Sequence, residues 1–497
     1  MKNLNAKHFL TALMICLPLC VSAYDFQVDG IYYLLNSSSS KEVSVTYKNS
    51  SYNSYSGTVD IPETVTYGSV TYSVTSIDSY AFYGSTSLAS VTIPSSVTSI
   101  GSYAFYNCTN LASVTISPGV TSIGDYAFYY CTSLASVTIP AGVTSMGDYA
   151  FAYCTSLASV TISSGVTSIG DYAFQSCYSL ADVTIPSSVT SMGDHAFAYC
   201  TSLASVTISS GVTSISSSAF LRCSSLADVT IPSSVTSIGD YAFYECTSLA
   251  SVTIPSGITT INEGAFYCCT SLMSVTIPSS VTYIKSKAFR ACYSLESITI
   301  PSSVTTIGTW AFCNCTSLAS VTIPSSVTSV GSYAFQGCTV LVSVYIESSP
   351  RLNEKVFYEC SDITDVYCLD ETPPSAYKSS YESNMFSVYS RATLHVPLGF
   401  SSTYEAHSLW GRFTTIVGDA TTGVSAIETD KGVCITGGEG KIEVSDVDGV
   451  VSVYSMDGSI VAHEVVNGNT EIALPRGLYI VRLPDGKEAV TRKIMVK

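Results

Sequence analysis

The chain has 497 residues, of which 46% are hydrophobic and 12% charged, and its formal net charge is −16. That length exceeds what one globular core accommodates, so the chain either divides into domains or grows in one dimension. The acidic balance and the lack of a basic stripe argue against nucleic acid and against an anionic membrane surface as partners.

Residues 1–23 predict an export signal. Lys2 and Lys7 precede an apolar run over residues 9–19, and Val21-Ser22-Ala23 offers a small-residue cleavage site. This order is typical of a secretory signal peptide and is too short to span a membrane. Cys20 leaves a lipoprotein signal as an alternative, although Leu19 is bulkier than the residue that usually precedes such a cysteine. No other stretch approaches the roughly 18 apolar residues of a transmembrane segment.

Residues 24–58 alternate apolar and polar side chains around a serine-rich turn. This pattern predicts β-strands. Because the end of a stacked sheet exposes unpaired strand edges, we expect this segment to form an N-terminal β cap.

Residues 59–360 repeat a 23-residue unit, and the copy over residues 88–110 reads LASVTIPSSVTSIGSYAFYNCTN. A fixed period of this size predicts a solenoid, here of about 12–13 rungs, in which each unit buries its apolar face against its neighbours. The Val-Thr-Ile alternation predicts a strand in every rung, and stacked copies form a parallel sheet. Ala-Phe followed by Cys fits a short helical or 3₁₀ turn. The expected fold is therefore a β-rich solenoid of parallel strands and short helical turns.

The period decays after residue 340. Residues 361–418, which contain Pro373-Pro374 and Trp410, are expected to cap the far end, and residues 419–424 to form a linker. Residues 425–497 predict a small antiparallel, β-sandwich-like domain, with turns expected at Asp448-Gly449, Asp457-Gly458, Asn467-Gly468 and Asp485-Gly486.

An acidic column recurs once per rung, just before the aromatic residue; its members are Asp125, Asp148, Asp171, Asp194 and Asp240. Stacked carboxylates could bind calcium in a ladder. The same position also holds serine and threonine, which share with aspartate the ability to cap the amides of a following helical turn. We favour capping.

A cysteine column contains 12 of the 18 cysteines: Cys108, Cys131, Cys154, Cys177, Cys200, Cys223, Cys246, Cys269, Cys292, Cys315, Cys338 and Cys360. An exported chain invites disulfides, and the rung spacing lies within bridging distance. Because side chains in one column point the same way, we instead expect buried free thiols.

Catalysis has little support in the sequence. The five histidines are scattered, and no nucleophile elbow, phosphate loop, zinc motif or other metal site is recognisable. A polysaccharide lyase on a parallel β-helix would need clustered acids with arginine or lysine, whereas the regular repeats carry only Arg222, Arg290, Lys285 and Lys287. We therefore expect that the protein is not an enzyme and that it binds neither a cofactor nor a metal ion.

The candidate ligand contacts occupy one aromatic position of the repeat: Tyr103, Tyr126, Tyr149, Tyr172, His195, Tyr241, Lys287, Trp310 and Tyr333. Exposed aromatic side chains rimmed by polar groups suit protein or glycan contact. The alternative is that these rings only stack into a ladder on the outer face. The serine and threonine side chains of the strands form a second candidate surface.

The pattern LxxVTIPxxVTSIGxYAFxxCxxL over residues 59–418 resembles the BspA-type leucine-rich repeat of surface proteins from Bacteroidota. The resemblance implies a secreted or cell-surface, outer-membrane-associated binding protein. Its partners would be host extracellular-matrix or mucosal proteins, or surface proteins and glycans of other bacteria. It brings no catalytic residues.

The tail resembles the C-terminal sorting domain of type IX secretion. The stretches VSVYSMDGSIV, LPRGLYIVRL and TRKIMVK match its blocks, and the recurring positions are Val451, Val453, Tyr454, Gly458, Gly477, Tyr479, Lys493 and Lys497. The leading hypothesis is an exported, non-enzymatic binding and adhesion protein. The alternatives are a carbohydrate-binding or polysaccharide-processing β-solenoid, or a structural spacer.

Overall fold

The structure of the protein is a computed structural model that describes residues 23–37, 39–49, 52–375, 385–420, 427–428, 434–438, 441–455, 460–475, 477–485 and 488–496. The predicted signal peptide, apart from Ala23, and residues 421–424 of the predicted linker lie outside the described residues.

The N-terminal part begins with an antiparallel meander whose third strand starts the solenoid. Phe26 pairs with Tyr33 across the first hairpin, whose turn places Asp29 and Gly30 at φ +48° and +84°. That pair of positive φ angles is typical of a tight two-residue hairpin turn. The meander's last strand, β3, then pairs in parallel with β6. The strands are β1 (Phe26–Val28), β2 (Ile31–Leu35), β3 (Glu42–Thr46), β4 (Ser56–Asp60), β5 (Thr64–Tyr67) and β6 (Val70–Ile77).

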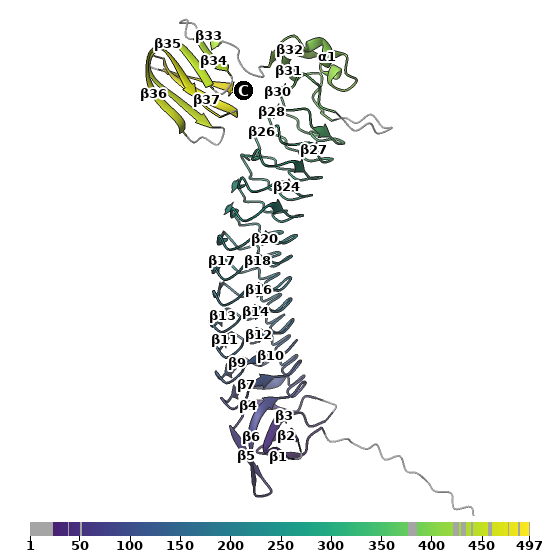
Figure 1. Ribbon diagram of the computed structural model, residues 1–497. Coiled ribbons are helices and arrows are strands. Elements are labelled where there is room, and N and C mark those ends of the chain that lie inside the picture. The colour runs from purple at the N-terminus through teal and green to yellow at the C-terminus, as the bar shows by residue number, and fades with distance from the viewer. Residues whose placement is uncertain are drawn as a thin grey trace, which may run out of the picture.

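Most rungs of the solenoid contribute strands to two sides of a single column (Figure 1), although the rung at residues 295–317 has a strand only on the second side. The first side, which we call the strand face, consists of β7 (Ser87–Ile93), β9 (Ser113–Ile116), β11 (Ser136–Ile139), β13 (Ser159–Ile162), β15 (Asp182–Ile185), β17 (Ser205–Ile208), β19 (Asp228–Thr230), β21 (Ser251–Thr253), β23 (Ser274–Thr276), β26 (Ser320–Ile323) and β28 (Ser343–Ile346).

The second side has two-residue strands: β8 (Ser99–Ile100), β10 (Ser122–Ile123), β12 (Ser145–Met146), β14 (Ser168–Ile169), β16 (Ser191–Met192), β18 (Ser214–Ile215), β20 (Ser237–Ile238), β22 (Thr260–Ile261), β24 (Tyr283–Ile284), β25 (Thr306–Ile307), β27 (Ser329–Val330) and β29 (Arg351–Leu352). Equivalent residues pair in parallel, as Ser122 does with Ser99 on one side and Ser145 on the other. Pairing in register follows from the strict 23-residue spacing.

The third side contains hydrogen-bonded turns rather than the helical turn that the sequence suggested. The Tyr103 backbone lies at φ +60°, which a right-handed helical turn does not allow. Alternate amides point in different directions: the Ala104 N–H donates back to the Gly101 carbonyl, whereas the Tyr103 N–H donates to Asp125 of the next rung at 2.8 Å. The turn is thus itself a connection between rungs.

The interior is filled by side-chain columns. The phenylalanine rings stack from rung to rung with centroids 4.6–5.8 Å apart and are almost parallel. The leucine, valine, isoleucine and alanine of each repeat are buried around them. Members of the cysteine column are buried as well, and each thiol donates to a phenylalanine carbonyl of the preceding rung at 3.0–3.3 Å.

The coil continues beyond the regular repeats. β28 pairs in parallel with β30 (Asp365–Cys368), β30 with β31 (Thr393–Pro397), and β31 with β32 (Thr415–Ala420). The helix α1 (Ser401–Glu405) and the 3₁₀ turn η1 (Trp410–Arg412) lie between the last two strands, and the buried Trp410 donates to the Pro374 carbonyl at 2.9 Å. With these irregular rungs the solenoid has about 15 turns.

The C-terminal strands, yellow in Figure 1, form an antiparallel sheet with its own small core. They are β33 (Ile427–Glu428), β34 (Cys434–Gly438), β35 (Lys441–Ser455), β36 (Ile460–Ala473), β37 (Gly477–Asp485) and β38 (Glu488–Val496).

Two of the turns predicted in this domain are wrong. Asp448 and Gly449 lie inside β35 and pair with Asn467 and Val466 of β36, next to a register shift between Val444 and Val447. The Asp448-Gly449 and Asn467-Gly468 dipeptides therefore lie within paired strands next to a β-bulge and do not form chain-reversing turns.

Candidate ligand-binding surface

The predicted aromatic contacts separate into three groups. Tyr103, Tyr126, Tyr149, Tyr172 and His195 form one ladder with Tyr80, in which the ring centroids are 4.5–5.1 Å apart and the planes lie within 11° of parallel. A second ladder of Tyr83, Tyr106 and Tyr129 runs beside the first. Because stacking covers the ring faces, these side chains are half-buried and present mainly their edges and hydroxyl groups.

The ladder ends where Ser218 replaces the aromatic residue. His195 is the last ring, and its Nδ1 atom is buried without a hydrogen bond among the described residues. Burial lowers the pKa of His195 even though Asp194 and Asp171 act in the opposite direction. A neutral imidazole therefore terminates the stack.

The second group is polar. The Tyr241 hydroxyl donates to Glu263 Oε1 at 2.7 Å, and Lys287 Nζ lies 2.9 Å from the same oxygen. The hydrogen bond from Lys287 lowers the pKa of Glu263, and Glu263 in turn raises that of Lys287. Gly264 occupies the aromatic position between Tyr241 and Lys287, and a Cβ there would lie 2.4 Å from the Tyr241 ring.

The third group consists of Trp310 and Tyr333, whose ring centroids are 5.7 Å apart. The Arg290 guanidinium lies 5.7 Å from the Trp310 centroid, and the Lys355 ammonium lies 5.7 Å from that of Tyr333. These distances fit cation–π contact, so basic residues cover the aromatic faces here.

A different aromatic stack on the strand face was not predicted. The Tyr345 and Tyr367 rings are 4.6 Å apart, and Tyr367 and His395 are 4.3 Å apart. His395 lies between two carboxylates, with Asp365 3.0 Å from Nε2 and Asp419 2.7 Å from Nδ1. His395 on β31 therefore connects to Asp365 on β30 and to Asp419 on β32.

The repeat spacing points to part of that stack. Tyr345 follows Thr322 by 23 residues and Tyr367 follows Tyr345 by 22, so both could have been assigned to the strand face from the sequence. His395 comes 28 residues later, after a segment that breaks the period, and only the structure brings it to the stack.

Several hydroxyl columns of the solenoid connect neighbouring rungs. One threonine column donates to the carbonyl 23 residues earlier at 2.9–3.4 Å; it includes Thr98, Thr121, Thr144, Thr167, Thr190, Thr236, Thr282, Thr305 and Thr328. Ser234, Ser280, Ser303 and Ser326 donate in the same way to the preceding rung. These hydroxyls are therefore committed to the coil.

The strand face differs. Between β9 and β23 its outward serine and threonine side chains are exposed, and their hydroxyls make no hydrogen bond within the described residues; examples are Ser113, Thr115, Ser136, Thr138, Ser159, Thr161, Thr184, Ser205 and Thr207. Asp182 and Asp228 are the charged side chains among the equivalent residues, and Glu296 lies one residue before the same column. This surface is a nearly neutral array of free hydroxyl groups.

The acidic column accepts amide hydrogen bonds, but the amide belongs to the next rung and not to the same turn. Asp125 Oδ1 accepts from the Asp148 N–H at 2.9 Å, and Asp148 Oδ1 accepts from the Asp171 N–H at 2.8 Å. Over the described residues, no group of three or more acidic, histidine or cysteine side chains is arranged to hold a metal ion. The described part also contains no helix with the length and apolar character needed to cross a membrane.

Residues 51–181, 167–296 and 282–397 match a protein family described as a BspA type leucine rich repeat region. Among solved structures, a leucine-rich repeat protein from Bacteroides ovatus is 30% identical, with 69% of this chain and 94% of that chain covered and a TM-score of 0.57. A leucine rich cell surface protein from Faecalibacterium prausnitzii is 28% identical, with coverages of 71% and 95% and a TM-score of 0.44. No protein with a curated description matches.

Proposed function

The chain belongs to the BspA-type leucine-rich repeat family, and from this we propose that it is an exported, non-enzymatic binding and adhesion protein. Proteins of this family are typically found at the cell surface. The signal peptide proposed for residues 1–23 would direct the chain out of the cytoplasm, in keeping with that location.

The observation that carries the proposal is the set of free hydroxyls on the strand face. Several other hydroxyl columns of the solenoid join rungs, yet the exposed side chains such as Ser136, Thr138 and Thr161 are left available to a partner. Because the same donors and acceptors recur on every rung, a long or repetitive ligand could make many weak contacts at once.

The aromatic residues are proposed as a supplementary contact. Inside the ladder, Tyr103, Tyr126, Tyr149 and Tyr172 can offer ring edges and hydroxyl groups, because their faces are stacked. The remaining candidate contacts lie at or beyond the end of the ladder and offer a wider range of side-chain types than its tyrosines. They are His195, Tyr241, Lys287, Trp310 and Tyr333.

The partners we propose are host extracellular-matrix or mucosal proteins, or surface proteins and glycans of other bacteria. An uncharged hydroxyl surface is also suited to a polysaccharide, which keeps a carbohydrate-binding solenoid as the second candidate. A glycan array decides between protein and carbohydrate, and turnover of any polysaccharide would contradict the non-enzymatic proposal.

The test is solid-phase binding of the purified protein to matrix proteins, mucosal glycoproteins and bacterial surface extracts. Replacing Thr138, Thr161 and Thr184 together by glutamate should weaken binding about tenfold or more, since it removes three hydroxyl groups and adds charges that binding would have to desolvate. The matched control replaces Ala141, Ser164 and Ser187 by glutamate, because these exposed residues lie beyond the strand ends of the same rungs. Equal binding by both variants, or no binding above a denatured sample, would refute the proposal.

A spacer function makes a different prediction for the ladder. Changing Tyr103, Tyr126 and Tyr149 to serine would leave binding intact if these rings only support the coil, and would weaken it if their edges contact the partner.

The C-terminal domain is proposed as a type IX sorting signal, in line with the resemblance of residues 425–497. Val451 and Val453 belong to its buried core, and the Tyr479 hydroxyl donates to the Pro475 carbonyl at 2.8 Å. Mass spectrometry of the exported protein tests the proposal, because loss of the domain after residue 420 would support it. The proposal is contradicted if the exported chain keeps the domain and a variant that lacks the domain is still exported.

A further inference from the structure

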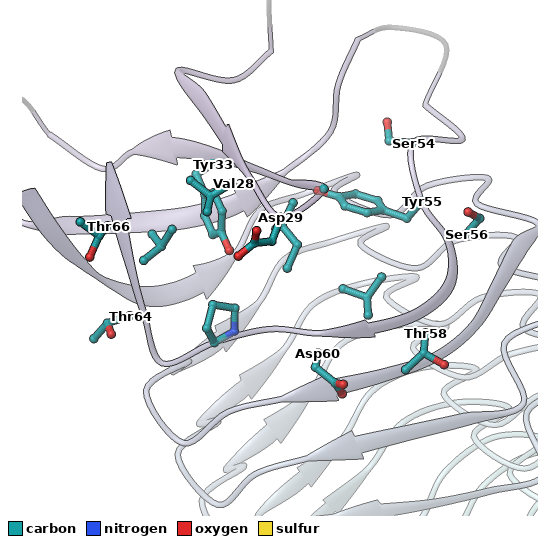
Figure 2. A pocket seen from close by; sticks show the side chains of 15 residues that line it. Val28, Asp29, Tyr33, Ser54, Tyr55, Ser56, Thr58, Asp60, Thr64 and Thr66 are labelled. Carbon is teal, nitrogen blue, oxygen red and sulfur yellow. The ribbon is translucent and has the colours of Figure 1, made fainter. Parts of the chain in front are cut away.

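A groove of about 590 Å³ opens at the N-terminal end of the solenoid, between the β1–β2 hairpin and strand β4 (Figure 2). Val28 and Ile31 line it from the hairpin, and Val59 and Val65 from β4 and β5, so part of its wall is apolar. Ser56, Thr58 and Asp60 of β4 lie along the opposite side. The groove lies at the N-terminal end of the strand-face sheet, beyond the free hydroxyls found between β9 and β23, so an inference drawn from it does not rest on the proposed function.

Strand β4 is the last strand of its sheet. It pairs in parallel with β7, and the sheet order is β4, β7, β9. The Ile61 N–H donates to the Thr92 carbonyl at 3.1 Å, which fixes the side on which this strand meets β7. Since the backbone groups of successive residues point to opposite edges, the N–H and C=O groups of Thr58 and Asp60 face away from β7 and toward the groove.

A free strand edge of this kind accepts another extended chain. The exposed Thr58 and Asp60 backbones offer two donors and two acceptors in the spacing of a β-ladder, and the apolar wall can take alternate side chains of an added strand. Pairing there would extend the parallel stack of rungs by one strand.

The charges of the groove select a basic chain. Asp29 lies at the hairpin turn and Asp60 at the end of β4, and both line the groove. Figure 2 shows the Asp29 carboxylate directed toward the Tyr33 hydroxyl. Burial, together with the Asp29 charge, raises the pKa of Tyr33 to about 12, so this hydroxyl stays neutral and the carboxylates alone supply the negative charge of the groove.

We propose that this groove binds an extended, basic segment of a partner protein as an additional strand along β4. The backbone of Thr58 and Asp60 supplies the hydrogen bonds, the apolar wall takes every second side chain, and Asp29 and Asp60 pair with lysine or arginine side chains. A sequence that alternates β-branched apolar with basic residues meets all three requirements.

The test uses labelled ten-residue peptides that alternate valine with lysine or valine with glutamate, titrated into the purified protein. The lysine peptide should bind about tenfold or more tightly than the glutamate peptide, and its affinity should fall with added salt. Hydrogen exchange with the lysine peptide bound should slow at the amides of Thr58 and Asp60. An N-methylated lysine peptide, which cannot complete a ladder, should not bind.

Two variants isolate the backbone contribution. Thr58→Pro removes the N–H that faces the groove and should weaken the lysine peptide about tenfold, whereas Thr58→Ala keeps that N–H and should bind within about twofold of the wild type. Asp29→Asn and Asp60→Asn should each reduce the preference for lysine over glutamate.

The proposal is overturned if the lysine peptide shows no binding up to about 1 mM, if both peptides bind equally, or if no amide of β4 becomes protected. A protein dimer that Thr58→Pro dissociates would identify a second copy as the occupant and would likewise overturn it. The strand-face glutamate variant should bind the peptide normally, which separates failure of this proposal from failure of the proposed function.

Discussion

The carboxylates of the acidic column illustrate how single side chains join rungs. Each accepts the backbone N–H of the following rung, as Asp148 does from Asp171 at 2.8 Å. That bond requires one acceptor oxygen at Oδ1 and no cation. Asp148, Asp171 and Asp194 are exposed, so the repulsion between neighbouring charges is screened by water and salt.

Asp148→Ala should therefore lower the free energy of unfolding by about 0.5–1.5 kcal/mol, since it removes one amide hydrogen bond. Asp148→Asn keeps the acceptor oxygen and should restore most of the loss. Chemical denaturation with and without calcium measures both effects. If calcium raised the stability of the wild type and not that of Asp148→Ala, the metal ladder and not the amide bond would explain the column.

The conformation of Tyr103 marks the limit of prediction at this scale. The sequence assigned this residue correctly to an outward column, because its spacing repeats. It could not reveal the φ of +60°, because nothing in the Tyr-Ala-Phe spacing distinguishes a helical turn from a turn with a left-handed residue. The inter-rung hydrogen bond of the Tyr103 N–H, which needs the neighbouring rung, stabilises that conformation.

Among the elements, strand length on the strand face depends on whether the strand's own rung or the next rung offers an N–H after its repeated isoleucine. β11, β15 and β26 are followed by proline yet have four residues, because Ser163, Ser209 and Glu347 of the next rung donate to their last carbonyl at 3.1 Å. Proline cannot donate, and it occurs in consecutive rungs at Pro232, Pro255 and Pro278. In that region the strands have three residues and the strand-face sheet is interrupted between β19 and β21.

Pro255→Ser recreates the Ile-Ser-Ser-Gly sequence of other rungs and should extend β21 by supplying a donor to Ile231. Hydrogen exchange over residues 251–256 should slow. The free energy of unfolding should change little, because the added hydrogen bond stabilises the folded chain while loss of proline increases the conformational entropy of the unfolded chain. The reciprocal change Ser163→Pro should speed exchange in β13. Unchanged exchange in both variants would contradict the link between proline and strand length.

For the whole molecule, the buried cysteine column dictates an alkaline limit of stability. Burial raises the pKa of Cys108 and Cys200 to about 12, well above the ordinary value of a thiol, and it raises the pKa of other members in the same direction. The folded chain therefore keeps thiol protons that the unfolded chain releases, so stability is constant below about pH 9 and is lost as the pH rises toward 12.

Each thiol contributes up to about 1.4 kcal/mol per pH unit in that window. Urea denaturation at several values between about pH 8 and 11 should show a steep fall above pH 9, and alkylation of the native protein should leave the column unmodified until it unfolds. A flat profile above pH 9 would mean that the thiols are accessible or oxidised.

The molecule as a whole was predictable where the period is strict. The 23-residue spacing gave the parallel register, the buried columns and the single-column shape. It could not give the pairing of Asp365, Thr393 and Thr415, because those residues are 28 and 22 apart and the register depends on the intervening chain. Nor could it reveal the groove beside β4, which depends on how the meander folds over the first rung.

The alternation of serine and proline has a consequence for how such a chain changes in evolution. Ser117, Ser163 and Ser209 recur every 46 residues and alternate with Pro94, Pro140 and Pro186. Recombination that removes residues 117–162 joins Ile116 to Ser163 and leaves every contact type as before. Removal of 23 residues would instead bring two prolines into neighbouring rungs. Within residues 94–209 the length can thus change in steps of two rungs without breaking the alternation, whereas a step of one rung breaks it.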